Sequence, residues 1–280
     1  ISVKYPGRCK INGSIAFSGS NITFRDLIIH DLDLQDRTLN NIALPDGFKY
    51  NSGSRLKFIN CIIYDCKEGI LDAANGTSEY YGCVIFFNGY DRPDRGHGHG
   101  IYAPSNNSAE SITIKHCIVF WQFGWGLHIY NELTMVYNVD AIENICFENG
   151  QLSTHGRNVD ILFGGSGLAW PKNCRALRNV TYGRDFTSGT GIRLGGGVAG
   201  SESCIIQDNF LAGGQYPFLF IGDNWGANTV TGNTFIGTPF NASYFPDNTV
   251  LAEFPTSGNN IFVYPNLYDA TRANVAIYNW

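Results

Sequence analysis

The chain repeats one short pattern of strand, turn and strand eight times, and this repetition limits its fold more than any other feature. Successive copies start 22 to 35 residues apart, and the shortest spacing suits one turn of a solenoid built from three short strands. Longer spacings fit the same turn with an inserted loop. The copies are DLIIHD, NCIIYD, GCVIFF, HCIVFW, NICFEN, NVTYGR, NFLAGG and NTFIGT, which start at Asp26, Asn60, Gly82, His116, Asn144, Asn179, Asn209 and Asn233.

These copies predict strands that stack as a parallel β-helix, with Asn at five of the eight first positions. Apolar residues one and three places later point into one core, because side chains alternate along a strand. Asn tolerates a left-handed backbone, and its amide can bond the Asn of the next rung to form a ladder. The alternative is that Asn only marks surface turns. We predict an all-β solenoid of about eight or more rungs, with an Asn ladder and inserted loops.

Composition narrows the partners. The chain has 33 Gly, 15% charged and 44% hydrophobic residues, which indicates many tight turns and excludes a disordered chain. A formal net charge of -5 disfavours a nucleic-acid partner, which needs a clustered basic face. No run of about 18 apolar residues occurs, so we predict no membrane span.

We expect one domain over residues 1–280. Residues 1–20 should form an N-terminal rung or cap, and residues 240–280 the last rung and its cap. The chain starts at Ile1 and ends at Trp280 inside an apolar run, so we expect a removed leader or a segment of a longer chain.

Five of the eight cysteines occupy repeated positions, which predicts that they stack inside the solenoid as free thiols. A disulfide is the alternative, because adjacent rungs lie about 4.8 Å apart. No spacing typical of a zinc site occurs. The five are Cys61, Cys83 and Cys117, one residue after the repeat start, and Cys174 and Cys204, five residues before it.

The third strand of each copy offers a column of outward side chains. Aligning the inward residues Phe48, Ile70, Ile101, Leu127, Val159, Ile192 and Leu219 gives the outward column Lys49, Leu71, Tyr102, His128, Asp160, Arg193 and Phe220. Four consecutive rungs thus present a phenol, an imidazole, a carboxylate and a guanidinium about 5 Å apart.

This row suits elimination from a uronic acid polymer. We expect Asp160 to fix the tautomer of His128 and to raise its pKa. His128 would then abstract a proton, Tyr102 would protonate the leaving oxygen, and Arg193 would bind the uronate carboxylate. The alternative is a solvated sheet face whose opposite charges only stabilise the strands.

Loops beside this row supply further candidate ligands of a sugar chain. The insertion NGYDRPDRGHGHGIYAPSNN leads into the strand of Tyr102, and QLSTHGRNVD leads into that of Asp160. Aromatic faces stack on sugar rings. A metal bound by two His residues is the alternative, but two ligands are a weak set, and we predict no metal. The candidate substrate-binding residues are Asp94, Arg95, His97, His99, Trp125, Tyr130 and Arg157.

The stacked pattern resembles the right-handed parallel β-helix proteins of the pectate-lyase-like superfamily. DRGHGHGIYAPSN, QFGWGLHIY and PNLYDATRANVAIYNW are similar to segments of a bacterial group of secreted β-helix proteins. The resemblance implies a right-handed helix and a polysaccharide partner. GHGI resembles a polygalacturonase motif, but the accompanying Asp-Asp pair is missing, as are the calcium-binding carboxylate cluster and the Trp-Asp-His motif of pectate lyases. Calcium therefore remains an option without a clear ligand set, and we expect no cofactor.

Two functions follow as hypotheses. The first is an enzyme that cleaves an acidic polysaccharide, with a lyase favoured over a hydrolase. The second is a non-catalytic adhesin, spike or filament subunit that self-associates through solenoid ends or side faces. Six N-x-S/T sequences support an extracellular or cell-surface location; they begin at Asn12, Asn21, Asn75, Asn106, Asn179 and Asn241.

Overall fold

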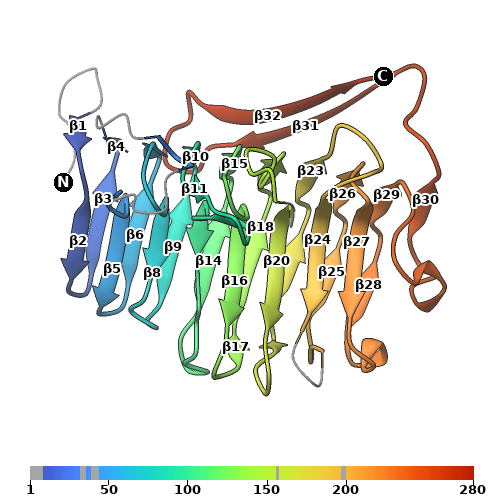
Figure 1. The fold of residues 1–280 in the computed structure, drawn as a ribbon, viewed down its shortest axis with the longest axis horizontal. Helices are drawn as coiled ribbons and strands as arrows, with labels where there is room; N and C mark the ends of the chain where they lie inside the picture. Colours follow the sequence, from blue (N-terminus) through green and yellow to red (C-terminus); the bar gives the residue numbers. More distant parts are fainter. Residues whose placement is uncertain (1–8, 32–35, 39–43, 156–157, 197–199) are drawn as a thin grey trace.

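The computed structural model describes residues 9–31, 36–38, 44–155, 158–196 and 200–280, and its strands stack along one long axis (Figure 1). Three parallel sheets form the solenoid. Sheet A contains, in spatial order, β1 (Cys9–Asn12), β4 (Leu27–His30), β7 (Ile62–Tyr64), β10 (Val84–Phe86), β15 (Ile118–Phe120), β19 (Ile145–Phe147), β23 (Val180–Tyr182), β26 (Phe210–Ala212), β29 (Thr234–Ile236) and β30 (Thr249–Leu251).

Sheets B and C complete each rung. Sheet B contains β2 (Ile15–Ser18), β5 (Phe48–Ser52), β8 (Ile70–Asp72), β13 (Ile101–Tyr102), β16 (Leu127–Asn131), β20 (Val159–Gly165), β24 (Thr190–Gly195) and β27 (Tyr216–Ile221). Sheet C contains β3 (Ile22–Arg25), β6 (Leu56–Ile59), β9 (Ser78–Tyr81), β14 (Ile112–Lys115), β18 (Val139–Ile142), β22 (Arg175–Leu177), β25 (Ile205–Gln207) and β28 (Thr229–Thr231).

The chain visits sheets A, B and C in turn, so the described residues form eight full rungs, and the predicted β-helix is confirmed. Smaller elements lie in the turns and at the end. They are β11 (Tyr90–Asp91) with β12 (Gly96–His97), β17 (Val136–Tyr137) with β21 (Pro171–Lys172), β31 (Asn259–Pro265) with β32 (Ala273–Asn279), and the 3-10 turns Trp225–Ala227 and Ala242–Tyr244.

Inward side chains from the three sheets fill the solenoid. In sheet B this inward column is fully buried, and removing its apolar surface from water stabilises the stack of rungs. The cysteines are free thiols, as predicted, and seven of the eight are buried. Burial raises the pKa of Cys83 well above its usual value, so this thiol is inert packing. The sheet B column is Phe48, Ile70, Ile101, Leu127, Ile161, Ile192 and Phe218.

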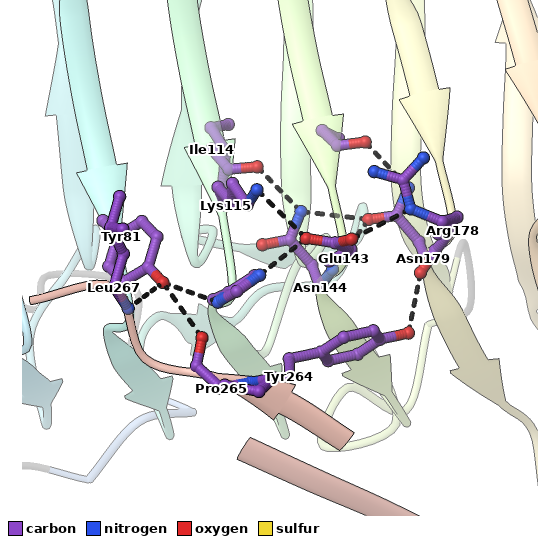
Figure 2. Close-up of polar contacts among 12 residues, drawn as sticks. Tyr81, Ile114, Lys115, Glu143, Asn144, Arg178, Asn179, Tyr264, Pro265 and Leu267 are labelled. Carbon is purple, nitrogen blue, oxygen red and sulfur yellow. Dashed lines mark hydrogen bonds and ion pairs between the residues drawn. The ribbon is translucent and has the colours of Figure 1, made fainter. Parts of the chain in front are cut away.

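The Asn ladder is present, but Asn60, the predicted member in the first half of the chain, is not part of it. Asn144, Asn179, Asn209, Asn233 and Asn248 form it. Each of the first four donates backbone and side-chain N–H groups to the amide oxygen of the next, and Asn248 is the last acceptor (Figure 2 shows Asn144 and Asn179).

The register explains the difference. Cys83 and Cys117, not Gly82 and His116, align with Asn144. The predicted alignment was therefore wrong by one residue there. The four predicted positions before Asn144 hold the left-handed turn residues Asp26, Asn60, Gly82 and His116.

Strands β31 and β32 form an antiparallel ribbon that runs along the side of the solenoid across the rungs (Figure 1). We expected residues 240–280 to supply the last rung and its cap; β30 joins sheet A, but the ribbon turns back along sheet A instead of closing the end. Tyr264 donates to the carbonyl of Arg178 (2.7 Å), and Tyr278 donates to that of Thr181 (2.8 Å).

The turn of the ribbon reaches the first rungs. The guanidinium of Arg25 donates to the carbonyl of Tyr268. The backbone N–H of Leu267 donates to the Tyr81 hydroxyl, as Figure 2 shows. Apolar side chains of the ribbon and of sheet A pack against each other in one cluster, which explains why the ribbon docks there.

Candidate groove on sheet B

The outer face of sheet B carries a groove of about 710 Å³. Its central column is Tyr102, His128, Leu162, Arg193 and Leu219, which are neighbours in the strand register. Other lining residues include Lys67, Glu68, Arg95, His97, His99, Trp125, Tyr130 and Glu132. The structure therefore brings most of the predicted site residues to one place.

Of the four predicted catalytic residues only Asp160 does not line the groove, and its predicted position beside His128 is wrong. Leu162 pairs with His128 and Arg193, because β20 is shifted by two residues from the predicted alignment. Asp160 instead aligns with Gly126 and Gly191. Val159, Ile161 and Phe163 alternate in the same phase, so the shift keeps the inward pattern and is hidden in the sequence.

Asp160 acts as a structural acceptor. Its carboxylate accepts the backbone N–H and the side-chain amide of Asn149, at 3.2 and 2.8 Å. Burial raises the pKa of Asp160 to about 7.

The same face carries a second column, in which His99 and Trp125 were predicted as site residues and Glu68 and Thr190 were missed. In four rungs one residue stands directly before a glycine that opens the sheet B strand: Glu68, His99, Trp125 and Thr190 before Gly69, Gly100, Gly126 and Gly191. A Cβ on Gly69 would lie 2.4 Å from the carbonyl oxygen of Gly100, so a close approach of rungs requires glycine here. The repeated EGI, HGI, WGL and TGI could have revealed Glu68.

Glu68 and His99 are bonded neighbours in this column. The backbone N–H of His99 donates to Glu68 Oε2 (2.7 Å), and the N–H of Trp125 donates to His99 Nδ1 (3.0 Å). Burial raises the pKa of Glu68 to about 8 despite that donor. Burial and the charge of Arg95 lower the pKa of His99 to about 3. At neutral pH, Glu68 is largely a protonated acid and His99 is neutral.

His128 is surrounded by other rings and lacks the predicted carboxylate partner. Its ring centroid is 4.6 Å from that of Tyr102 and 4.9 Å from that of Tyr130, with His99 and Trp125 also in contact. Only 4% of the residue is exposed, and neither ring nitrogen has a hydrogen-bond partner among the described residues.

Burial, followed by the neighbouring His99 and then by the charges of Arg95 and Arg193, lowers the pKa of His128 well below its usual value. The predicted increase is therefore wrong, because Leu162 and not Asp160 stands beside His128 in the strand register. Burial also raises the pKa of Tyr102, to about 12, which keeps this phenol protonated.

Hydrogen bonds from a later rung hold the segment that carries Arg95 and His97. Asp91 accepts the hydroxyls of Ser153 (2.6 Å) and Thr154 (2.8 Å) from a later rung. Although burial opposes it, these donors lower the pKa of Asp91 to about 2. These hydrogen bonds connect the hairpin of β11 and β12 to the segment that follows β19.

The remaining predicted ligands divide between the groove and its surroundings. Asp94 is exposed outside the lining and bonds His97 Nε2 (3.0 Å), while Arg95 lies 5.7 Å over the Trp125 ring. Tyr130 lines the groove beside His128. Arg157 lies outside the described residues.

Neither a metal cluster nor a membrane-spanning helix occurs in the described ranges. No group of three or more His, Cys, Asp or Glu side chains there is arranged to hold a metal ion. Likewise, none of the helices described is long and apolar enough to cross a membrane.

The stacked rungs define a solenoid that carries a groove on the outer face of sheet B. The model of the right-handed β-helix region matches residues 7–146, half of the chain, and the chain belongs to that family. No curated protein and no solved structure shows a significant match to it. The family thus shows a β-helix repeat protein, a fold that serves carbohydrate-active and structural proteins alike.

Proposed function

We propose that the sheet B groove binds and cleaves an acidic, uronate-containing polysaccharide by β-elimination. One observation carries this proposal: an enclosed carboxyl group, Glu68, shares the groove with a protonated phenol, Tyr102, and with the cations Lys67, Arg95 and Arg193. Aromatic side chains in the lining offer faces for sugar rings.

The proposed reaction uses groups that the groove exposes rather than the buried His128. Arg193 pairs with the uronate carboxylate and makes the neighbouring C5–H more acidic. Deprotonated Glu68 takes the C5 proton, the C–H electron pair becomes the C4–C5 double bond, and the C4–O4 bond breaks. Tyr102 donates its proton to the departing O4. The products are an unsaturated uronate and a new chain end.

Ultraviolet absorbance of the unsaturated product, followed with a panel of uronate polysaccharides, tests this directly. We expect absorbance to rise with wild type and with Glu253→Gln, whose carboxyl is exposed away from the groove. Tyr102→Phe and Arg193→Ala should lose the signal. Absence of both absorbance change and new reducing ends across the panel would refute cleavage.

The pH dependence separates elimination from hydrolysis. Glu68 as the base must be deprotonated, so kcat/KM for elimination should rise with pH and level off above about 8. Glu68 as the general acid of a hydrolase must be protonated, so kcat/KM should instead fall above about 8. Reducing ends without absorbance, together with that falling limb, would favour a hydrolase.

The alternative function, a non-catalytic binding or structural β-helix, has one observation in its favour. The outward face of the ribbon exposes four aliphatic side chains that no described residue covers: Ile261 (59%), Val263 (53%), Val275 (46%) and Ile277 (64%). Contiguous exposed apolar surface of this kind marks interaction sites.

A further inference from the structure

The outer edge of β32 presents unpaired backbone groups. Hydrogen bonds from Asn266 N–H to the Arg272 carbonyl and from Trp280 N–H to the Gly258 carbonyl flank the ladder of the ribbon. In an antiparallel pair, residues alternate between facing the partner strand and facing away. Even-numbered residues of β32 therefore bond β31. The N–H and C=O groups of the odd-numbered residues point to the outer edge, where no described residue pairs with them.

That edge forms one wall of a second cavity, the crevice, of about 590 Å³. Residues 275–280 line the wall, and β31 contributes none of the lining. The floor comes from sheet A and is apolar and aromatic. Its residues are Ile145, Cys146, Phe147, Val180 and Tyr182, with Arg184 and Phe254 at the side.

The edge also lacks the usual protection against strand pairing. Natural edge strands carry charges, prolines or bulges that block the approach of another strand. The sequence of β32 is ANVAIYN, with no charged residue and no proline, and its register with β31 is unbroken over seven pairs.

The ribbon is already held in the geometry that a partner would need. Tyr264 and Tyr278 anchor it to backbone carbonyls of the solenoid, and the bonds of Tyr264 and of the turn are visible in Figure 2. Trp280 stacks on Phe254 with ring centroids 5.5 Å apart, and both rings line the crevice. Binding of a further strand would therefore not require the entropy cost of ordering β32.

We propose that the crevice binds an extended apolar segment of another polypeptide, which adds to the free edge of β32 as a third strand. Backbone donors and acceptors at strand spacing recognise a strand, and the apolar floor recognises alternate side chains. The site lies on sheet A, so it is independent of the proposed cleavage in the groove on sheet B.

A labelled synthetic peptide with the sequence of residues 258–265 tests this by fluorescence anisotropy, because that strand already pairs with β32 and carries apolar residues on both faces. Ile277→Pro removes one outer-edge N–H from β32. Ile261→Pro is the matched control, because Ile261 is the cross-strand partner and its N–H points to the opposite edge.

We expect the peptide to bind wild type and Ile261→Pro alike, and Ile277→Pro at least tenfold more weakly. The same peptide with N-methylated alternate residues should bind wild type at least tenfold more weakly, which tests the proposal even if a proline variant unfolds. Equal binding to Ile277→Pro would overturn it, since the peptide would then replace β31 or contact side chains only. No binding to wild type, or binding of a small apolar dye alone, would also overturn it.

Discussion

Two clusters of Tyr, His and Glu lie on outer faces of the solenoid, and they use the same groups in opposite ways. In the ribbon cluster, His116 Nδ1 bonds the Tyr81 hydroxyl (2.7 Å) and Nε2 bonds Glu143 (2.6 Å), and the ribbon covers them (Figure 2). In the groove cluster of Glu68, His99, Tyr102 and His128, the buried His128 ring has no such partners among the described residues.

The carboxyl groups of Glu143 and Glu68 differ in pKa and therefore in charge near neutral pH. Although burial opposes it, donors from His116, Arg178 and Lys115 lower the pKa of Glu143 to about 2. Burial raises the pKa of Glu68 to about 8. A paired carboxylate stabilises a fold, whereas a carboxyl group near neutrality, in a groove, is suited to proton transfer.

Of the two carboxyl groups, only Glu68 should affect kcat/KM. Glu68→Gln removes the proposed base and should lower kcat/KM by roughly 100- to 10,000-fold. Glu143→Gln is the matched control, because it weakens the ribbon cluster without touching the groove and should leave kcat/KM unchanged. Steady-state kinetics on the most active uronate polymer decides; equal losses in both variants would remove the distinction.

A buried acid without a cation should also reduce stability at higher pH. The folded pKa of Asp160, about 7, exceeds its ordinary value of 3.8, so its favourable contribution is full below about pH 4 and is lost as pH rises toward 7. Asp160→Asn keeps the acceptor for Asn149 and should stabilise the protein above pH 7 by up to about 4 kcal/mol. Urea unfolding at pH 4 and pH 8 measures this; a gain that does not change with pH would contradict the assignment.

Loss of the satisfied histidine should destabilise the fold. His116→Phe removes the partner of the Tyr81 hydroxyl and one donor to Glu143, and we expect a loss of about 1–3 kcal/mol. Thermal unfolding followed by circular dichroism measures it. An unchanged Tm would show that the ribbon cluster contributes nothing to stability.

Replacing His128, whose ring nitrogens have no partner among the described residues, should instead stabilise the fold. His128→Phe keeps a ring between Tyr102 and Tyr130 and removes two buried nitrogens without partners, so we expect a gain of about 1 kcal/mol. The same unfolding experiment applies. A loss comparable to that of His116→Phe would mean that His128 has a partner in solution, such as an ordered water.

The sequence predicted the solenoid because its repeat and alternation are local. Site geometry failed where alternation is ambiguous: in β20, Val159, Ile161 and Phe163 are interchangeable by pattern, and Asp160 stands where other rungs have glycine. Glu68 could have been found by aligning the residues before those glycines.

Other features could not be read from the chain. The raised pKa of Glu68 and the lowered pKa of His128 depend on which side chains cover them. The docking of the ribbon depends on contacts between distant residues, such as Arg25 with Tyr268, 243 positions apart.

The ribbon has a consequence for how the length of this solenoid can change. Repeat proteins gain and lose rungs readily, because each rung contacts only its neighbours. Here one rigid hairpin is fastened near Arg25 at one end and near Arg178 and Thr181 at the other. An added or deleted rung between these points would move them apart or together by about 4.8 Å and break the match. The ribbon therefore acts as a ruler that fixes the number of rungs between its anchors.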